Sequence, residues 1–157
     1  MPDSGWEAAM GRIPSGLFIL TLQQMERATG LLVSWVQQCA FVPPLLTIGL
    51  RKGRYHGLWL KASAAATLHI LGEEHKALVR HFAQGFAEEV DAFAGLAVER
   101  RAPLAPLLRD TLAALDLRFL QSHAVGDHEL MVLEVIGGQP LQEGKPYVHL
   151  RKSGLNY

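Results

Sequence analysis

The chain has 157 residues, 49% of them hydrophobic, which suits a single globular domain over residues 1–157 with a substantial core. Fifteen lysines and arginines balance fifteen aspartates and glutamates, so the formal net charge is zero. This balance argues against nucleic acid as the main partner, because proteins that bind phosphate backbones usually present a net basic face.

The first half of the chain predicts short strands joined by tight connections. A short helix is expected at Ser4–Met10, where Ser4 would cap the helix and Glu7 stands three residues later. The polar segment Met25–Gly30 predicts a hairpin-like connection, and Arg54–Leu60 a second short helix. Strands are predicted in the apolar segments Gly16–Leu22, Leu31–Val36, Leu45–Leu50 and Thr67–Leu71.

The second half begins with the clearest predicted helix, Glu74–Phe86. Apolar side chains recur on one side of this helix, at Leu78, Val79, Phe82 and Phe86. After it, Pro103 and Pro106 predict a loop, and Leu107–Leu112 predicts one or two helical turns.

Two further strands are predicted near the end of the chain. Leu115–Leu120 alternates apolar and polar residues, as a half-buried strand does. Glu129–Ile136 follows the turn sequence Gly126-Asp127-His128 and is expected to end at Gly137-Gly138. Tyr147–Leu150 predicts a last short strand. Many short strands with few helices favour a mainly β barrel over a parallel doubly wound sheet.

The cysteine count and the lack of targeting signals indicate the compartment. Cys39 is the only cysteine, so no internal disulfide can form and nothing points to an oxidising compartment. Residues 1–11 carry the acidic residues Asp3 and Glu7 and no lysine or arginine, unlike a secretory signal. The longest apolar stretch, Phe41–Leu50, is too short to cross a bilayer. We therefore expect a cytoplasmic protein without a membrane partner.

Common catalytic motifs are absent from the sequence. The glycines form neither G-x-G-x-x-G nor a P-loop, and no H-E-x-x-H, C-x-x-C or G-x-S-x-G occurs, so no metal site is predicted. The remaining candidates are two basic pairs, Arg51-Lys52 and Arg151-Lys152, and the turn histidine His128. Each also fits a plain surface role, as solvated charges at strand ends or an exposed histidine.

Five sequence blocks spread over nearly the whole chain carry a further signal. They are Gly11–Thr21, Ser34–Pro44, His81-Phe82, Gly126–His128 and Arg151–Tyr157. In this order they resemble flavin reductase-like domains, including those at the C-terminus of cyanobacterial flavodiiron proteins. The resemblance implies an FMN-binding split β-barrel, mainly β with a few helices, in which two subunits of a homodimer build each flavin site.

The resemblance also implies a flat slot for the flavin ring and an anion site for its phosphate. The cofactor-binding residues implied are Ser34, Trp35, Val36, Gln37, Gln38, Cys39, Ala40, Arg51, Lys52, Phe82 and Tyr157. The Ser34 hydroxyl can donate a hydrogen bond to the flavin. Arg51 and Lys52 can neutralise the phosphate through charge-assisted hydrogen bonds. Trp35 also fits a second interpretation, an indole at the edge of a core strand.

By the same resemblance, His128 is the catalytic candidate, near both the flavin and the approach of the nicotinamide. Its role there would be positioning and hydrogen bonding, because hydride transfer from NADH or NADPH to flavin is the cofactors' own chemistry. The residues alone leave a structural alternative open, in which His128 only closes its turn through a bond to a backbone carbonyl.

The chain departs from its relatives at Ala40, where many have serine, and at Ala66 and His69, where phenylalanine and asparagine are usual. Three functions therefore stay open. The first is an NAD(P)H-dependent reductase that passes electrons from reduced FMN to an acceptor or partner protein. The second is a non-catalytic flavin-binding or electron-relay protein. The third is a structural homodimer that has lost flavin.

Overall fold

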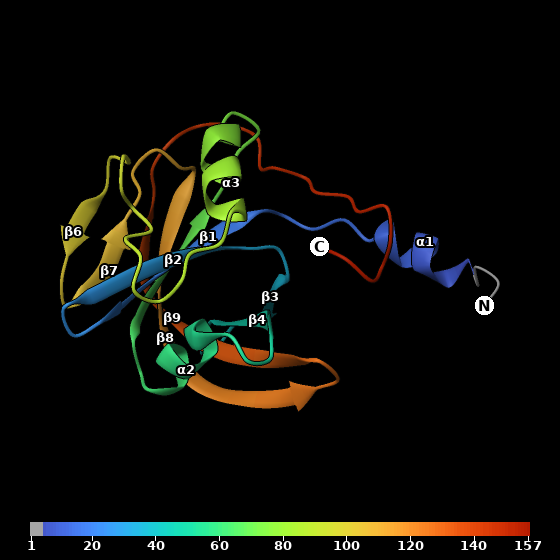
Figure 1. Ribbon diagram of the computed structural model, residues 1–157, viewed down its shortest axis with the longest axis horizontal. Helices are drawn as coiled ribbons and strands as arrows, with labels where there is room; N and C mark the ends of the chain where they lie inside the picture. Colours follow the sequence, from blue (N-terminus) through green and yellow to red (C-terminus); the bar gives the residue numbers. More distant parts are fainter. Residues whose placement is uncertain (1–4) are drawn as a thin grey trace.

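A computed structural model describes residues 5–157, and its main feature is a strongly curved antiparallel sheet of seven strands (Figure 1). The strands are β1 (Phe18–Gln24), β2 (Arg27–Val33), β3 (Val36–Ala40), β4 (Leu45–Arg51), β5 (Ala65–Ile70), β8 (Ala113–Val125) and β9 (His128–Pro140). They are hydrogen-bonded in the order β2-β1-β5-β8-β9-β4-β3, so β2 and β3 are edges and the described barrel is not closed. The predicted mainly β split barrel is confirmed.

Short helices and a separate hairpin surround this sheet. The helices are α1 (Trp6–Gly11), α2 (Tyr55–Lys61) and α3 (Lys76–Ala83), and the hairpin consists of β6 (Glu99–Arg101) and β7 (Leu104–Leu107). In Figure 1, α1 stands away from the barrel beside the C-terminal segment, whereas α3 lies next to β1 and β2. Among residues 5–157, no helix is long and apolar enough to cross a membrane.

Strand β1 separates two apolar cores, because successive side chains of a strand point to opposite faces. Leu20 and Leu22 face the barrel interior, where Trp59 of α2 also packs. Ile19 faces the other core, where it meets Phe82 of α3. Burial on both faces explains why this strand is a nearly continuous apolar run in the sequence.

The contact between α3 and β2 depends on a glycine. A Cβ atom on Gly30 would lie 2.8 Å from Cε1 of Phe82, closer than packed atoms tolerate. Because Gly30 has no side chain, the Phe82 ring packs directly against the β2 backbone and is only 2% exposed. The helix is thereby held close to the middle of β2.

Most predicted elements occur, but the prediction around Val36 was wrong. The predicted strand Leu31–Val36 is divided: β2 ends at Val33, and Val36 begins β3, which the sequence analysis missed. Strand β3 is an edge strand whose central residues are all exposed. It therefore lacks the alternation of apolar and polar residues by which a half-buried strand is predicted.

The segment after α3 also differs from the prediction. Pro103 and Pro106 do not form a plain loop, because they belong to the β6–β7 hairpin, and residues 108–112 form no helix. Proline is tolerated in β7 because that strand pairs only with β6. Tyr147–Leu150 is not a strand either; its His149 makes an isolated bridge to Ser15.

Several helices and strands begin or end at residues other than those predicted from the sequence. The predicted cap Ser4 lies outside the described residues, β2 already begins at Arg27, and α3 is shorter than Glu74–Phe86. Strand β9 continues through Gly137-Gly138 to Pro140. A Cβ atom on Gly138 would lie 2.7 Å from the carbonyl oxygen of Ala114, so a glycine is what allows the close pairing with β8 there.

His69 on β5 is a core histidine with both ring nitrogens bonded. Its Nε2 accepts a hydrogen bond from the Leu108 backbone N–H at 3.0 Å, which leaves Nδ1–H to donate to the Ile19 carbonyl at 3.1 Å. The ring is 0% exposed, and burial lowers the pKa of His69 from 6.5 to about 4. His69 is thus neutral in the folded protein at mildly acidic pH.

This neutral histidine makes the fold sensitive to acid. Between pH 6.5 and pH 4 the unfolded chain protonates His69 and the folded chain does not, so stability falls as pH falls through this window. We expect this residue to lower the free energy of unfolding by about 2 kcal/mol at pH 5 relative to pH 7.5. Urea unfolding at both pH values should show a smaller loss in His69→Gln, whose amide does not titrate. An equal loss of unfolding free energy in the wild type and in His69→Gln would show that His69 is not the cause of the acid sensitivity.

Candidate functional site

A cavity of about 530 Å³ lies between β2, β4, α2, α3 and the C-terminal segment. Its volume falls within the range of small-molecule sites, about 300–1,000 Å³. The apolar part of its wall comes mainly from Leu17, Leu31, Val33, Leu50, Val79, Phe82 and Phe86. The polar groups include Ser34, Arg51, Arg54, His56 and Tyr157.

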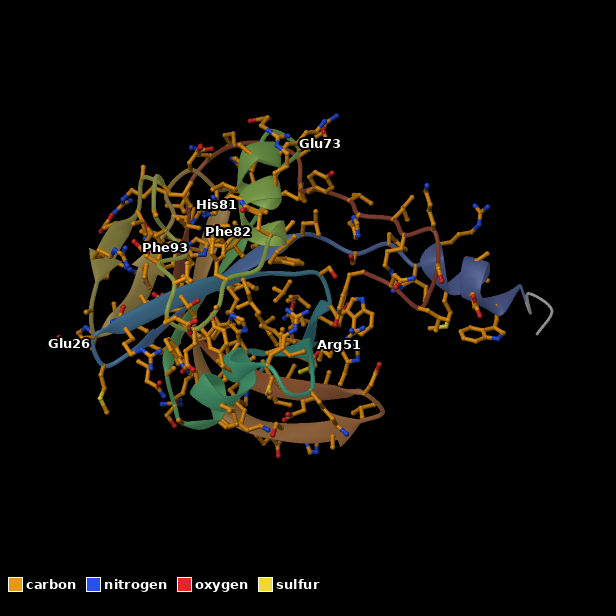
Figure 2. The ribbon with its side chains drawn as sticks, in the orientation of Figure 1. Glu26, Arg51, Glu73, His81, Phe82 and Phe93 are labelled. Atoms are coloured by element: carbon orange, nitrogen blue, oxygen red, sulfur yellow. The ribbon has the colours of Figure 1, made fainter. Side chains whose placement is uncertain are left out.

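The two kinds of wall come from different parts of the fold. Figure 2 shows Phe82 beneath α3, whereas Arg51 lies on the side of β3 and β4. Apolar side chains suit a flat aromatic ring, and the guanidinium groups of Arg51 and Arg54 suit a phosphate, which they can bind through paired, charge-assisted hydrogen bonds. The cavity therefore fits a ligand that has an aromatic body and an anionic end, as FMN has.

A second cavity of about 110 Å³ lies on the other side of Arg51 and Tyr157. These two residues line both cavities and so form the wall between them. The smaller cavity is also lined by Trp35, Asp127 and His128. The predicted catalytic histidine is thus one shared wall away from the larger cavity.

His128 is held at the first position of β9, where it pairs with Arg51 of β4. Its Nδ1 lies 2.6 Å from Oδ1 of Asp127, and its Nε2 is hydrogen-bonded to the hydroxyl of Tyr157. The hydrogen bond from His128 lowers the pKa of the Asp127 carboxyl. With the ring proton on Nδ1, the Asp127 carboxylate accepts a hydrogen bond from Nδ1–H and Nε2 accepts a hydrogen bond from the Tyr157 hydroxyl.

Aromatic packing fixes the same cluster. The ring centroids of Trp35 and His128 are 4.7 Å apart, and those of Trp35 and Tyr157 are 5.0 Å apart. The guanidinium carbon of Arg151 lies 5.5 Å from the Trp35 ring centroid. Burial raises the pKa of Tyr157, so its hydroxyl keeps its proton at neutral pH. His128 therefore has a set orientation, with side chains as its partners.

The structure brings together some of the residues predicted from the sequence and separates others. Ser34, Phe82, Arg51 and Tyr157 line the larger cavity. Val36 packs against the barrel core. Of the remaining predicted residues, Gln37, Gln38, Cys39, Ala40 and Lys52 line neither of the two cavities.

The departures from the family pattern lie away from the larger cavity. Ala66 belongs to the barrel core, and His69 is bonded to the backbone as described above. Neither residue is among those that line the cavity. In this chain Ala66 therefore contributes to core packing.

Sequence analysis missed most residues of this wall, among them the polar residues Arg54 and His56. Both fell inside a predicted short helix, and the available signal was a histidine within the otherwise apolar run Tyr55–Leu60. His56 is 5% exposed, and its ring stacks on Tyr55 with centroids 3.9 Å apart. Neither of its ring nitrogens has a hydrogen-bond partner among residues 5–157.

The open antiparallel sheet places the chain in the split-barrel class, and its larger cavity has both apolar and cationic lining residues. The chain matches the family described as "Flavin reductase like domain" over residues 10–154. It belongs to this family, which confirms the resemblance seen in the sequence.

Curated relatives are longer proteins of cyanobacteria. The chain is 38% identical over 152 residues to putative diflavin flavoprotein A 3 of Synechocystis sp., an alignment that covers 96% of this chain and 26% of the relative. A further relative is putative diflavin flavoprotein A 6 of Nostoc sp. It is 36% identical over 159 aligned positions, and the alignment covers 28% of that relative. The chain thus spans only 26% and 28% of the length of these two relatives.

Solved structures share the fold at low sequence identity. NADH:FAD oxidoreductase SgcE6 of Streptomyces globisporus C-1027 has a TM-score of 0.83 at 21% identity, over 92% of this chain and 86% of that one. SgcE6 has also been solved in complex with NAD and FAD fragments. The styrene monooxygenase flavin reductase of Pseudomonas putida S12 has a TM-score of 0.76 at 20% identity, over 91% of each chain.

Proposed function

We propose that this protein binds FMN in the cavity of about 530 Å³ and catalyses the reduction of that flavin by NADH or NADPH. The observation that carries this proposal is the joint lining of one cavity by a largely apolar wall and by Arg51 and Arg54. Membership of the flavin reductase-like family supports it, as do the NAD and FAD fragments in a structure of SgcE6.

In this proposal the chain's own residues bind and orient the ligands. Arg51 and Arg54 hold the phosphate, Ser34 offers a hydroxyl, and the apolar wall around Phe82 holds the ring and excludes water. Hydride transfer from nicotinamide to flavin is chemistry that the two cofactors supply. His128, hydrogen-bonded to Tyr157 in the wall of the flavin cavity, helps to orient the nicotinamide against the flavin ring, because hydride transfer requires the two rings to be in contact.

The proposal extends to the destination of the electrons. Reduced flavin passes them to an acceptor or a partner protein, in line with the longer diflavin flavoproteins that share this domain. The working compartment is the cytoplasm, where the exposed thiol of Cys39 would stay reduced.

The working form in this proposal is a homodimer. Apolar side chains are exposed where the segment after α1 runs beside the C-terminal segment: Ile13 is 59% and Leu150 62% exposed, and both lie within two residues of the antiparallel Ser15–His149 bridge. Exposed apolar patches often mark interfaces, and these two segments extend away from the barrel (Figure 1). In a dimer, the exposed strand residues Gln37 and Gln38 are available to the partner's flavin site.

The phosphate assignment predicts different effects for two neighbouring cations. We expect Arg51→Ala to weaken FMN binding by about 1.5–3 kcal/mol, because one charge-assisted bond is lost, and to leave riboflavin binding unchanged. Lys52→Ala is the matched control, since Lys52 is exposed and lines neither cavity. Fluorescence titration of both flavins measures the two affinities. Equal weakening of FMN in the two variants would contradict the role of Arg51.

The orienting role of His128 predicts a kinetic defect without a binding defect. We expect His128→Ala to bind FMN nearly as the wild type does but to be reduced by NAD(P)H about a hundredfold more slowly, because the nicotinamide loses its orientation. Stopped-flow reduction of the FMN-loaded variant measures the rate, and its melting curve reports folding. A lower melting temperature with an unchanged rate would mean that His128 only stabilises its turn.

If exposed apolar side chains form the dimer interface, replacing them with polar ones should lower the mass of the protein particle in solution from dimer to monomer. We expect the double variant Ile13→Ser, Leu150→Ser to sediment as a monomer at micromolar concentration, whereas the wild type sediments as a dimer. Met25→Ser is the control, because Met25 is 89% exposed beside Glu26, at the far side of the barrel in Figure 2. A monomeric wild type, or a dimeric double variant, would refute this interface.

A further inference from the structure

His56 presents an unusual combination of burial and unmet hydrogen bonding. It lines the larger cavity, is 5% exposed, and has no hydrogen-bond partner for Nδ1 or Nε2 among residues 5–157. Buried polar groups are bonded in the great majority of cases. Because His56 borders a cavity and both its ring nitrogens lack a partner in the described chain, we infer that a bound ligand supplies their hydrogen-bond partners.

The imidazole of His56 is held in place before any ligand arrives. It stacks on the ring of Tyr55, with an interplanar angle of 29°. The Tyr55 hydroxyl is itself anchored at 2.8 Å from Thr29 Oγ1, and it donates to the Phe86 carbonyl at 2.8 Å. A stacked ring of this kind loses little freedom when it forms a new hydrogen bond.

The charge state of His56 limits what it can recognise. Burial first, and the positive charge of Arg54 second, lower its pKa to about 4, against a smaller opposing effect of Glu88. At neutral pH the ring therefore offers one donor and one acceptor and carries no charge. This pair matches hydroxyl groups, which both donate and accept, whereas phosphate is better bound by the neighbouring guanidinium groups.

The position of His56 also favours recognition of hydroxyl groups over phosphate. Arg54, whose charge acts on His56, is one of the proposed phosphate ligands, and Tyr55 links His56 to Phe86 of the apolar wall. In a riboflavin phosphate the ribityl chain likewise lies between the phosphate and the ring. We propose that His56 forms hydrogen bonds with the ribityl hydroxyl groups of the bound flavin, an inference that rests on the proposed function.

Three ligands separate the parts of the flavin that His56 contacts. FMN has ring, ribityl chain and phosphate, riboflavin lacks the phosphate, and lumiflavin has the ring alone. We expect His56→Leu to weaken FMN and riboflavin alike, by about tenfold for the loss of one hydrogen bond, and to leave lumiflavin unchanged. His56→Asn, whose amide keeps a donor and an acceptor, should lose less affinity than His56→Leu.

Other patterns would overturn the inference. A loss for FMN alone would place His56 at the phosphate, an equal loss for all three ligands would place it at the ring, and no loss would remove it from the site. A wild type that binds none of the three would instead refute the proposed function.

A second measurement does not depend on whether His56→Leu folds. In wild-type protein labelled with ¹⁵N-histidine, riboflavin should shift the His56 ring-nitrogen signals and lumiflavin should not. The spectrum of His56→Asn assigns these signals, and signals unmoved by riboflavin would overturn the inference.

Discussion

The two edges of the open barrel are formed by strands that are consecutive in the sequence. Strand β2 ends at Val33 and β3 begins at Val36, yet β2 and β3 lie at opposite ends of the hydrogen-bonded order. Ser34 and Trp35 must therefore carry the chain from one edge to the other. The cavity lies along this crossing, with Ser34 in the wall of the larger cavity and Trp35 in the wall of the smaller one.

A chain without net charge still builds a cationic site, because charge is concentrated locally. Arg51 comes from the end of β4 and Arg54 from the turn before α2, and both line the same cavity. Arg51 also faces the cluster of Trp35, His128 and Tyr157 in the smaller cavity. One arginine thus belongs both to the proposed phosphate site and to the cluster around His128.

Two buried histidines show how hydrogen bonding separates a structural role from a ligand-binding one. Burial lowers the pKa of both His56 and His69 to about 4. His69 is satisfied on both ring nitrogens by the backbone of Ile19 and Leu108, so it needs nothing further. His56 has no partner among residues 5–157 and borders a cavity. Burial and pKa alone would not have told them apart.

The sequence by itself determined the elements whose signals are local. The alternation in Leu115–Leu120 and the apolar side of the α3 helix predicted their burial correctly, and five motif blocks identified the family. Only the tertiary structure decided which neighbours share a site. Arg51 and Lys52 look equivalent in the sequence, but Arg51 ends β4 and lines both cavities, whereas Lys52 lies in the following turn and lines neither. The physical reason is that burial and side-chain direction depend on contacts between segments far apart in the chain, and local residue patterns do not contain those contacts.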